Sequence, residues 1–377
     1  WFLIGKNVPS KSYLLLQINF ILGGILGTQL SAEVMSAIRE MVGEHFSIHQ
    51  IAKTGGSGPK VVIISDESGQ KFAFKYGKTR IPIHQQIASQ ELLEPYFKGK
   101  LPKVMKHRDN GGGYESMLML APSELTLHEA VVRDSISDED IVSTFTDIIA
   151  HYTGMWSATR QEYHEAACTR QCGLRREAIL KALNETVICF RSFGSLYDHQ
   201  IVVNGQSLGQ IRDLLKVTGM SINPKDGVLC HGDPNADNFL ISRGAGTDEE
   251  TSWWLVDYEW VGRNNWLLSA SHFIGWWLSN ASRLKSQANT EIKGNRLEFS
   301  YGLYFSDLVN NLMSVAEAKA RSFAAEVGEE DFQTKLRCLI AALLLGDIRF
   351  AISRGKSESY VDILIAEGFK ILHEISQ

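Results

Sequence analysis

The feature that most constrains this chain is a short strand-rich segment, 228–257, set in a C-terminal half whose pattern is otherwise helical. It holds two apolar runs joined by a polar turn, which is typical of a β-hairpin. Asp233 and Asn238 lie in the loop before the first run, and Asp257 ends the second. We therefore expect three oxygen-bearing side chains to converge at one end of the hairpin.

Such a trio has the chemistry that phosphoryl transfer requires, because that reaction depends on positioning and charge neutralisation more than on covalent catalysis. An aspartate can accept the proton of a substrate hydroxyl. An asparagine and a second aspartate can hold Mg²⁺, a hard cation that prefers oxygen ligands. The neighbouring Gly232 and Pro234 provide the tight backbone geometry of a turn that presents a carboxylate.

The rest of the chain divides near Pro122. Strand patterns and a glycine-rich turn dominate before it, and amphipathic helical patterns dominate after it. The pattern predicts an α+β fold. The expected elements are a helix capped by Ser31 and ending near Gly43, strands at 46–53, 61–64, 71–76 and 114–120, a helix at 83–97, and helices at 137–159, 173–193, 206–217 and from about 301 onward.

His231-Gly232-Asp233, with Asn238 five residues after the aspartate and Asp257-Tyr258-Glu259 after the hairpin, resembles the motifs of the aminoglycoside phosphotransferase and choline/ethanolamine kinase superfamily. The resemblance is strong over 228–262 and covers most of the chain from about residue 48. It implies a two-lobed, protein-kinase-like fold. With the break near Pro122 as the boundary, the nucleotide-binding N-lobe and an N-terminal extension take 1–121, and a helical C-lobe takes 122–377. The segment before residue 31 has no counterpart in the family. It also implies ATP, Mg²⁺ and a small hydroxylated acceptor.

The family roles pass to individual residues of this sequence. Asp233 resembles the catalytic base, Asn238 and Asp257 the Mg²⁺ ligands, and Lys75 the lysine that grips the ATP phosphates. The remaining residues that the resemblance assigns to ATP are Gly55, Gly56, Ser57 and Gly58 of a nucleotide-covering loop, Glu91 or else Glu94 as the helix carboxylate that pairs with Lys75, and Met119 and Ala121 of a hinge strand beside adenine.

One departure leaves a second interpretation open. Family members usually carry an aspartate ten to twelve residues after the metal-binding one, where it supports the catalytic loop, but here the segment 267–271 reads Leu-Leu-Ser-Ala-Ser. Ser269 or Ser271 is the expected substitute. If neither acts, the chain is a pseudokinase that binds nucleotide or serves as a scaffold. A protein-directed kinase is disfavoured, because the only His-Arg-Asp, at 107–109, precedes the hinge strand.

The composition of the chain limits the classes of partner that it can bind. The net charge is −5 and no basic block stands out, which argues against nucleic acid and weakly favours a cationic acceptor of the choline or aminoglycoside type. Glu259 and Trp260 are the candidates to hold its ammonium group, by Coulomb and cation–π attraction. The acceptor itself and the oligomeric state stay open.

Location and metal content follow from weaker signals. Five cysteines without a paired framework are typical of a reducing compartment, so we expect a cytoplasmic protein. His164, Cys168 and Cys172 share one helical face, but a structural zinc site needs four ligands. The apolar run 13–30 approaches membrane-span length, yet its polar residues and glycines favour buried structure, and no membrane association is expected.

Overall fold

The structure is a computed structural model, and it describes residues 30–52, 60–79, 81–123, 125–133, 135–162, 198–217, 224–243, 251–280, 288–302, 305–353 and 356–377. Contacts divide the chain into two compact units, 1–47 with 65–70 and 48–64 with 71–377. Several predicted features lie outside the described residues: the glycine loop at 55–58, the apolar run as far as residue 29, the trio His164, Cys168 and Cys172, and the helix 173–193.

The first unit contains α2 (Ala32–Val42), the helix expected between Ser31 and Gly43. The hydroxyl of Ser31 accepts a hydrogen bond from the backbone N–H of Val34 at 3.5 Å and so satisfies a donor of the first turn. Val34 and Ile38 are buried at helical spacing. Gly43 ends the helix with a φ of 112°, a conformation that favours glycine.

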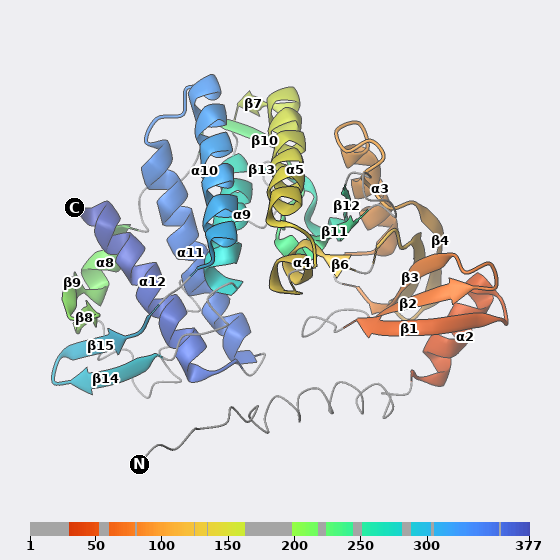
Figure 1. Ribbon diagram of the computed structural model, residues 1–377, viewed down its shortest axis with the longest axis horizontal. Coiled ribbons are helices and arrows are strands. Elements are labelled where there is room, and N and C mark those ends of the chain that lie inside the picture. Colours follow the sequence, from red (N-terminus) through yellow and green to blue (C-terminus); the bar gives the residue numbers. More distant parts are fainter. Residues whose placement is uncertain are drawn as a thin grey trace, which may run out of the picture. The chain divides into compact units, whose positions relative to one another are not determined.

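The second unit contains a five-stranded sheet of order β1-β2-β3-β5-β4, to which β1 and β2 contribute the parts that lie in this unit (Figure 1). Its strands are β1 (Phe46–Ala52), β2 (Lys60–Asp66), β3 (Lys71–Lys78), β4 (Val104–Gly111) and β5 (Tyr114–Leu120). β3 and β5 pair antiparallel, with Lys75 opposite Met117. Helix α3 (Ile83–Leu93) packs against the sheet through Ile83, which contacts Met117 and Met119.

Two small sheets follow. The first contains β7 (Gln161–Glu162), β10 (Asp226–Cys230) and β13 (Gly262–Asn265), and the second contains β6 (Leu125–Thr126), β11 (Phe239–Ser242) and β12 (Ser252–Leu255). The predicted hairpin is confirmed, because β11 and β12 pair antiparallel with Phe239 opposite Leu255. Short 3₁₀ turns, η2 (Ala236–Asn238) and η3 (Tyr258–Trp260), lie at the same end of the hairpin.

The remainder of this unit is mainly helical, so the predicted α+β class is confirmed. The helices are α4 (Leu127–Arg133), α5 (Asp138–Thr159), α8 (Ile211–Val217), α9 (Trp266–Asn280), α10 (Asp307–Val327), α11 (Phe332–Ser353) and α12 (Glu358–Ser376). α9 packs against α10 and α11, and α5 lies beside α10 (Figure 1). The largest fully buried side chains are Trp156, Trp253, Trp266 and Trp277, which makes this helical core the main apolar core of the unit.

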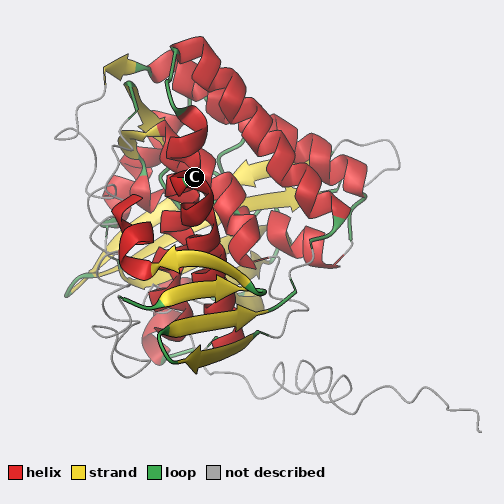
Figure 2. Cartoon of the chain, turned by 90° about the vertical axis from the view of Figure 1, so that its left-hand side faces the viewer, coloured by secondary structure: helices red, strands yellow, loops and turns green. Residues whose placement is uncertain are grey.

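The helix predicted over 206–217 is wrong in its first half. Residues 206–210 form β9 (Gln206–Gln210), which pairs antiparallel with β8 (Gln200–Val203). Asn204 and Gly205 join them with positive φ angles of 49° and 84°, the geometry of an Asn-Gly hairpin turn. Together with β14 (Asn289–Lys293) and β15 (Arg296–Ser300) they form a four-stranded sheet that packs on α12 (Figure 2).

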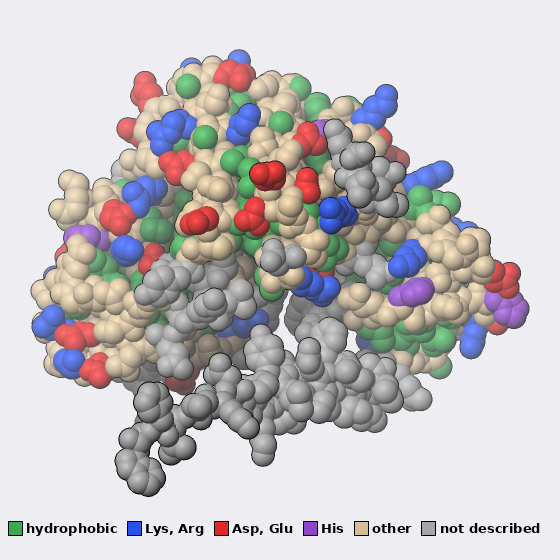
Figure 3. Space-filling view, viewed as in Figure 1, with side chains coloured by type: hydrophobic (Ala, Val, Ile, Leu, Met, Phe, Trp, Pro, Cys, Tyr) green, Lys and Arg blue, Asp and Glu red, His purple; other side chains and the backbone are tan. Residues whose placement is uncertain are grey.

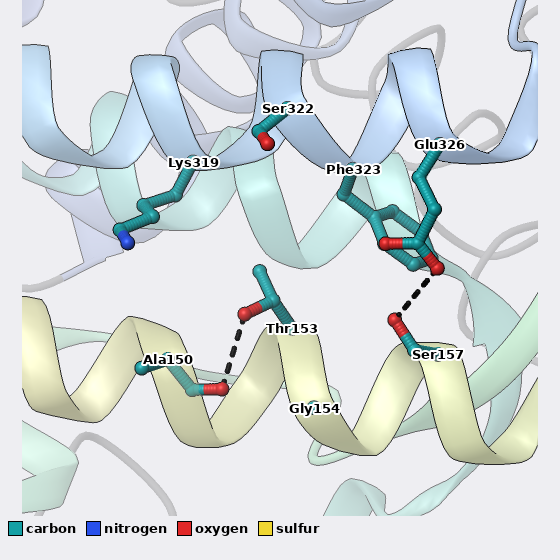
Figure 4. A pocket seen from close by; sticks show the side chains of 8 residues that line it. All are labelled: Ala150, Thr153, Gly154, Ser157, Lys319, Ser322, Phe323 and Glu326. Carbon is teal, nitrogen blue, oxygen red and sulfur yellow. Dashed lines mark hydrogen bonds between the residues drawn. The ribbon is translucent and has the colours of Figure 1, made fainter.

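The surface carries charges of both signs. On the face seen in Figure 3, Lys, Arg, Asp and Glu side chains are interspersed. Among the described helices, none is both long enough and apolar enough to cross a bilayer. Between α5 and α10 lies a hollow of about 310 Å³ (Figure 4), and its lining on α5 includes Ala150, Gly154 and Ser157. None of the lining residues was predicted for the site.

Candidate active site

The loop between β10 and β11 is fixed around the backbone of Asp233. The carbonyl oxygen of Asp233 accepts hydrogen bonds from the backbone N–H of Asn235 and from Nδ2 of Asn238, each at 2.8 Å. Gly232, with a φ of 89°, makes the left-handed turn that precedes it. The Asp233 side chain is 29% exposed. A rigid backbone therefore presents a carboxylate that a substrate can reach.

Asn238 and Asp257 meet at the same end of the hairpin, as the sequence predicts. The backbone N–H of Val256 donates to the carbonyl of Asn238 at 3.0 Å, which places the residue after Val256 next to the catalytic loop. Asp257 adopts a φ of 68° and a ψ of 71°. This left-handed conformation costs an L-residue about 1 kcal/mol or more, although aspartate tolerates it better than most residues. The strained turn directs the chain from β12 into η3.

His231 links the loop to this turn. Its Nε2 lies 3.1 Å from the carbonyl oxygen of Val256 and donates to it, since a carbonyl only accepts. Burial lowers the pKa of His231 to about 4, so the ring is neutral at physiological pH. A buried ring that donates to the backbone of Val256 connects the loop to this turn, in keeping with the structural role that a histidine usually has in such a turn.

Lys75 on β3 reaches this cluster from the five-stranded sheet. Its Nζ lies 2.7 Å from Oε1 of Glu259, 3.2 Å from Oε1 of Gln86 and 3.7 Å from Oδ1 of Asp257. The Lys75 and Glu259 side chains are only 11% and 17% exposed. The structure therefore brings together four of the residues that the sequence singles out: Asp233, Asn238, Asp257 and Lys75.

The carboxylate that pairs with Lys75 is neither of the two predicted, Glu91 and Glu94. Glu91 and Glu94 are exposed, whereas Gln86 on α3 is buried and faces Lys75. Glu91 follows Gln86 by five residues, which turns it about 140° around a helix and away from β3. Glu259, assigned from the sequence to the acceptor, is the carboxylate that pairs with Lys75. Trp260 beside it is half-buried.

The residues predicted to form the hinge lie at the end of β5, where two backbone donors are already engaged. Met119 and Ala121 are buried at and just beyond the end of β5. The N–H of Ala121 donates to the carbonyl of Lys71 at 3.1 Å, and the N–H of Leu120 donates to that of Lys103 at 3.0 Å. Pro122, which follows, has no N–H. Leu120, Ala121 and Pro122 therefore offer no free backbone N–H group to an adenine ring.

The charges of the cluster fit a divalent cation. Asp257 and Glu259 both lie within 4 Å of the ammonium group of Lys75, and Asp233 is a third carboxylate close to Asp257. Burial raises the pKa of Asp257, the carboxylates of Glu259 and Asp233 raise it further, and Lys75 opposes them. The Nδ2 of Asn238 is bound to Asp233, so the amide oxygen is the atom left for a cation. A bound cation would relieve the excess of negative charge.

The donor set also indicates which cation. Among the described residues, no three His, Cys, Asp or Glu side chains gather as metal ligands. One carboxylate and one amide oxygen suit Mg²⁺, which takes its other ligands from phosphate and water. Asn238 and Asp257 are therefore the residues that would hold it.

Comparison with known proteins gives a likeness of fold. No protein-family model matches the chain, and no curated protein matches it in sequence. The chain resembles solved small-molecule kinases. An aminoglycoside-3′-phosphotransferase of type VIII is 12% identical over 84% of this chain and 99% of its own, with a TM-score of 0.46. An amicoumacin kinase solved with AMP-PNP, Ca²⁺ and amicoumacin is 14% identical over 91% and 94%, with a TM-score of 0.45.

A putative fructosamine-3-kinase from Thermobifida fusca is 11% identical over 88% of this chain and 96% of its own, with a TM-score of 0.45.

The two serines predicted to replace the acidic residue missing after Asp257 both lie in α9. Ser271 donates its hydroxyl to the carbonyl of Leu268 at 2.8 Å, within α9, and Ser269 is buried in the same helix. His272 of α9 approaches the loop of Asp233, with its Nε2 3.8 Å from Oδ1 of Asp233. Sequence reasoning missed this contact, although the missing aspartate marked the region as one to inspect.

The pairing of Lys75 can be tested without any assay of activity. A double-mutant cycle with Lys75→Met and Glu259→Gln, measured by urea unfolding, is expected to show a coupling free energy of about 1–3 kcal/mol, because both side chains are largely buried. The matched cycle with Glu91→Gln is expected to give no more than about 0.5 kcal/mol. A larger coupling to Glu91 than to Glu259 would contradict the observed pair.

Proposed function

We propose that this chain is an ATP- and Mg²⁺-dependent small-molecule kinase, with the N-lobe ending near residue 121 and ATP held between the two lobes. The observation that carries the proposal is the convergence of Asp233, Asn238, Asp257 and Lys75, which come from two loops and a separate sheet. A turn or a helix cap explains one such residue, but not a base, two cation ligands and an anion-binding lysine in one cluster.

Each residue then has one task. The carboxylate of Asp233 orients the acceptor hydroxyl and takes its proton as the oxygen bonds to the γ-phosphorus and the bond to the ADP oxygen breaks. Asn238 and Asp257 hold Mg²⁺, which neutralises charge on the phosphates. Lys75, kept in place by Glu259 and Gln86, directs its ammonium group toward the nucleotide phosphates.

The geometry disfavours the protein-kinase alternative. The His-Arg-Asp triplet at 107–109 lies in β4, at the edge of the five-stranded sheet, and its residues are exposed. A strand edge of this kind is not a catalytic loop. The pseudokinase alternative rests on the segment 267–271, which carries no aspartate where family members usually have one to support the catalytic loop. An assay of phosphoryl transfer separates it from a working kinase.

The catalytic role of Asp233 predicts a specific loss. Asp233→Asn is expected to lower kcat by about two to four orders of magnitude, because the amide cannot accept the proton, while the affinity for ATP changes little. ADP release coupled to a reporter enzyme measures kcat, and calorimetry measures the affinity. Wild-type turnover in this variant would remove Asp233 from the mechanism.

We propose a cationic acceptor whose ammonium group is bound by Asp237 and not by Glu259. Glu259 already binds an ammonium group of the chain, that of Lys75. Asp237 lies four residues after Asp233, and its side chain is 55% exposed while its Oδ1 contacts Nδ1 of His128 at 2.9 Å. The ring of Trp276 meets that of His128 edge to face, with centroids 4.7 Å apart. An exposed carboxylate beside aromatic rings suits an ammonium group.

The acceptor prediction calls for a panel. ADP release is measured with choline, ethanolamine, several aminoglycosides and neutral sugars of similar size. A cationic acceptor is expected to give the highest kcat/KM. Asp237→Asn is expected to raise its KM about tenfold or more with little change in kcat, because an interaction shared by ground and transition states is lost. If the acceptor with the highest kcat/KM is neutral, and its KM does not change in Asp237→Asn, the cationic class is refuted and the kinase proposal stands.

A further inference from the structure

The ring of His272 is fixed by a contact within its own helix. His272 lies in α9, is 4% exposed, and its Nδ1 is 2.7 Å from the carbonyl oxygen of Leu268. A carbonyl oxygen has only lone pairs, so Nδ1 must carry the proton of this hydrogen bond. In a neutral ring, Nε2 would then have a lone pair and no proton.

That second nitrogen faces the proposed catalytic base. Nε2 of His272 lies 3.8 Å from Oδ1 of Asp233, which is within ion-pair distance but longer than a hydrogen bond. A lone pair directed at a carboxylate is repelled, whereas a protonated Nε2 is attracted. Burying an imidazolium is costly unless an anion compensates it, and the carboxylate of Asp233 lies at the distance where it does so.

We propose that charged His272 is the positioning residue of Asp233, taking over from α9 the support that the resembling family obtains from an acidic side chain. This inference rests on the proposed function, because it assigns a role within the same site. His272 holds the carboxylate in the orientation that receives the acceptor's proton, and it does not touch the acceptor. The missing aspartate would support the catalytic loop. Its part is taken here by the contact of His272 with the side chain of Asp233.

If His272 has only a structural role, a different nitrogen of its ring matters. A histidine that only fills the core of α9 needs its Nδ1 bond to Leu268 and has no need of Nε2. The two nitrogens can be tested separately, because the amide nitrogen of asparagine reaches about as far as Nδ1 and that of glutamine about as far as Nε2. His272→Asn keeps a donor for Leu268, and His272→Gln keeps a donor for Asp233.

Steady-state kinetics separate the two roles. We expect His272→Asn to lower kcat about 10- to 100-fold with an unchanged KM for ATP, and His272→Gln to retain kcat within about threefold. Ser271→Ala, the neighbouring α9 variant, is expected to match the wild type. The opposite order, with glutamine impaired and asparagine active, overturns the proposal, and so does equal impairment of both.

A second measurement does not depend on activity. In ¹⁵N spectra of the histidine rings at pH 7, His272 is expected to carry protons on both nitrogens in the wild type and to lose the Nε2 proton in Asp233→Asn. A neutral His272 ring in the wild type overturns the inference, even if the chain transfers phosphate. A charged ring in a chain that transfers no phosphate to any acceptor upholds the contact and refutes the proposed function.

Discussion

The pairing of β11 with β12 is the constraint on which the site depends. It places Asn238 at the start of one strand and Asp257 just past the end of the other, so that two residues 19 positions apart share one end of a hairpin. The hydrogen bonds of Asn238 and Val256 then connect that end to the loop of Asp233. The proposed cation ligands and the proposed base are thus brought together by a few backbone hydrogen bonds.

The second requirement is a link between this hairpin and the five-stranded sheet, which the pair Lys75–Glu259 provides. Glu259, which pairs with Lys75, follows Asp257 by two positions, so the lysine and the proposed cation ligand are positioned by one turn, η3. Displacement of that turn would therefore disturb the proposed phosphate contact and the proposed cation contact together. Gln86 adds a neutral partner from α3 that costs less to bury than a charge.

What the sequence could predict was local. The hairpin and the spacing of Asp233, Asn238 and Asp257 are written in a single stretch, and Ser31 and Gly43 punctuate α2, so these predictions agree with the structure. The partner of Lys75 is 184 residues away, and no periodicity reports such a contact. The helical period of 206–217 favours a helix there, whereas Asn204-Gly205 is the typical turn of the β8–β9 hairpin that forms in its place.

The proposed cation site of Asn238 and Asp257 is tested most directly by calorimetry, which measures the affinity for a nucleotide. AMP-PNP is titrated into the wild type, Asn238→Ala and Asp257→Ala, each with and without Mg²⁺. We expect tight binding only with Mg²⁺ in the wild type, and a loss of that dependence that is greater in Asp257→Ala, which removes a charge as well as a ligand. Equal affinities in all three proteins, with or without Mg²⁺, would contradict the account.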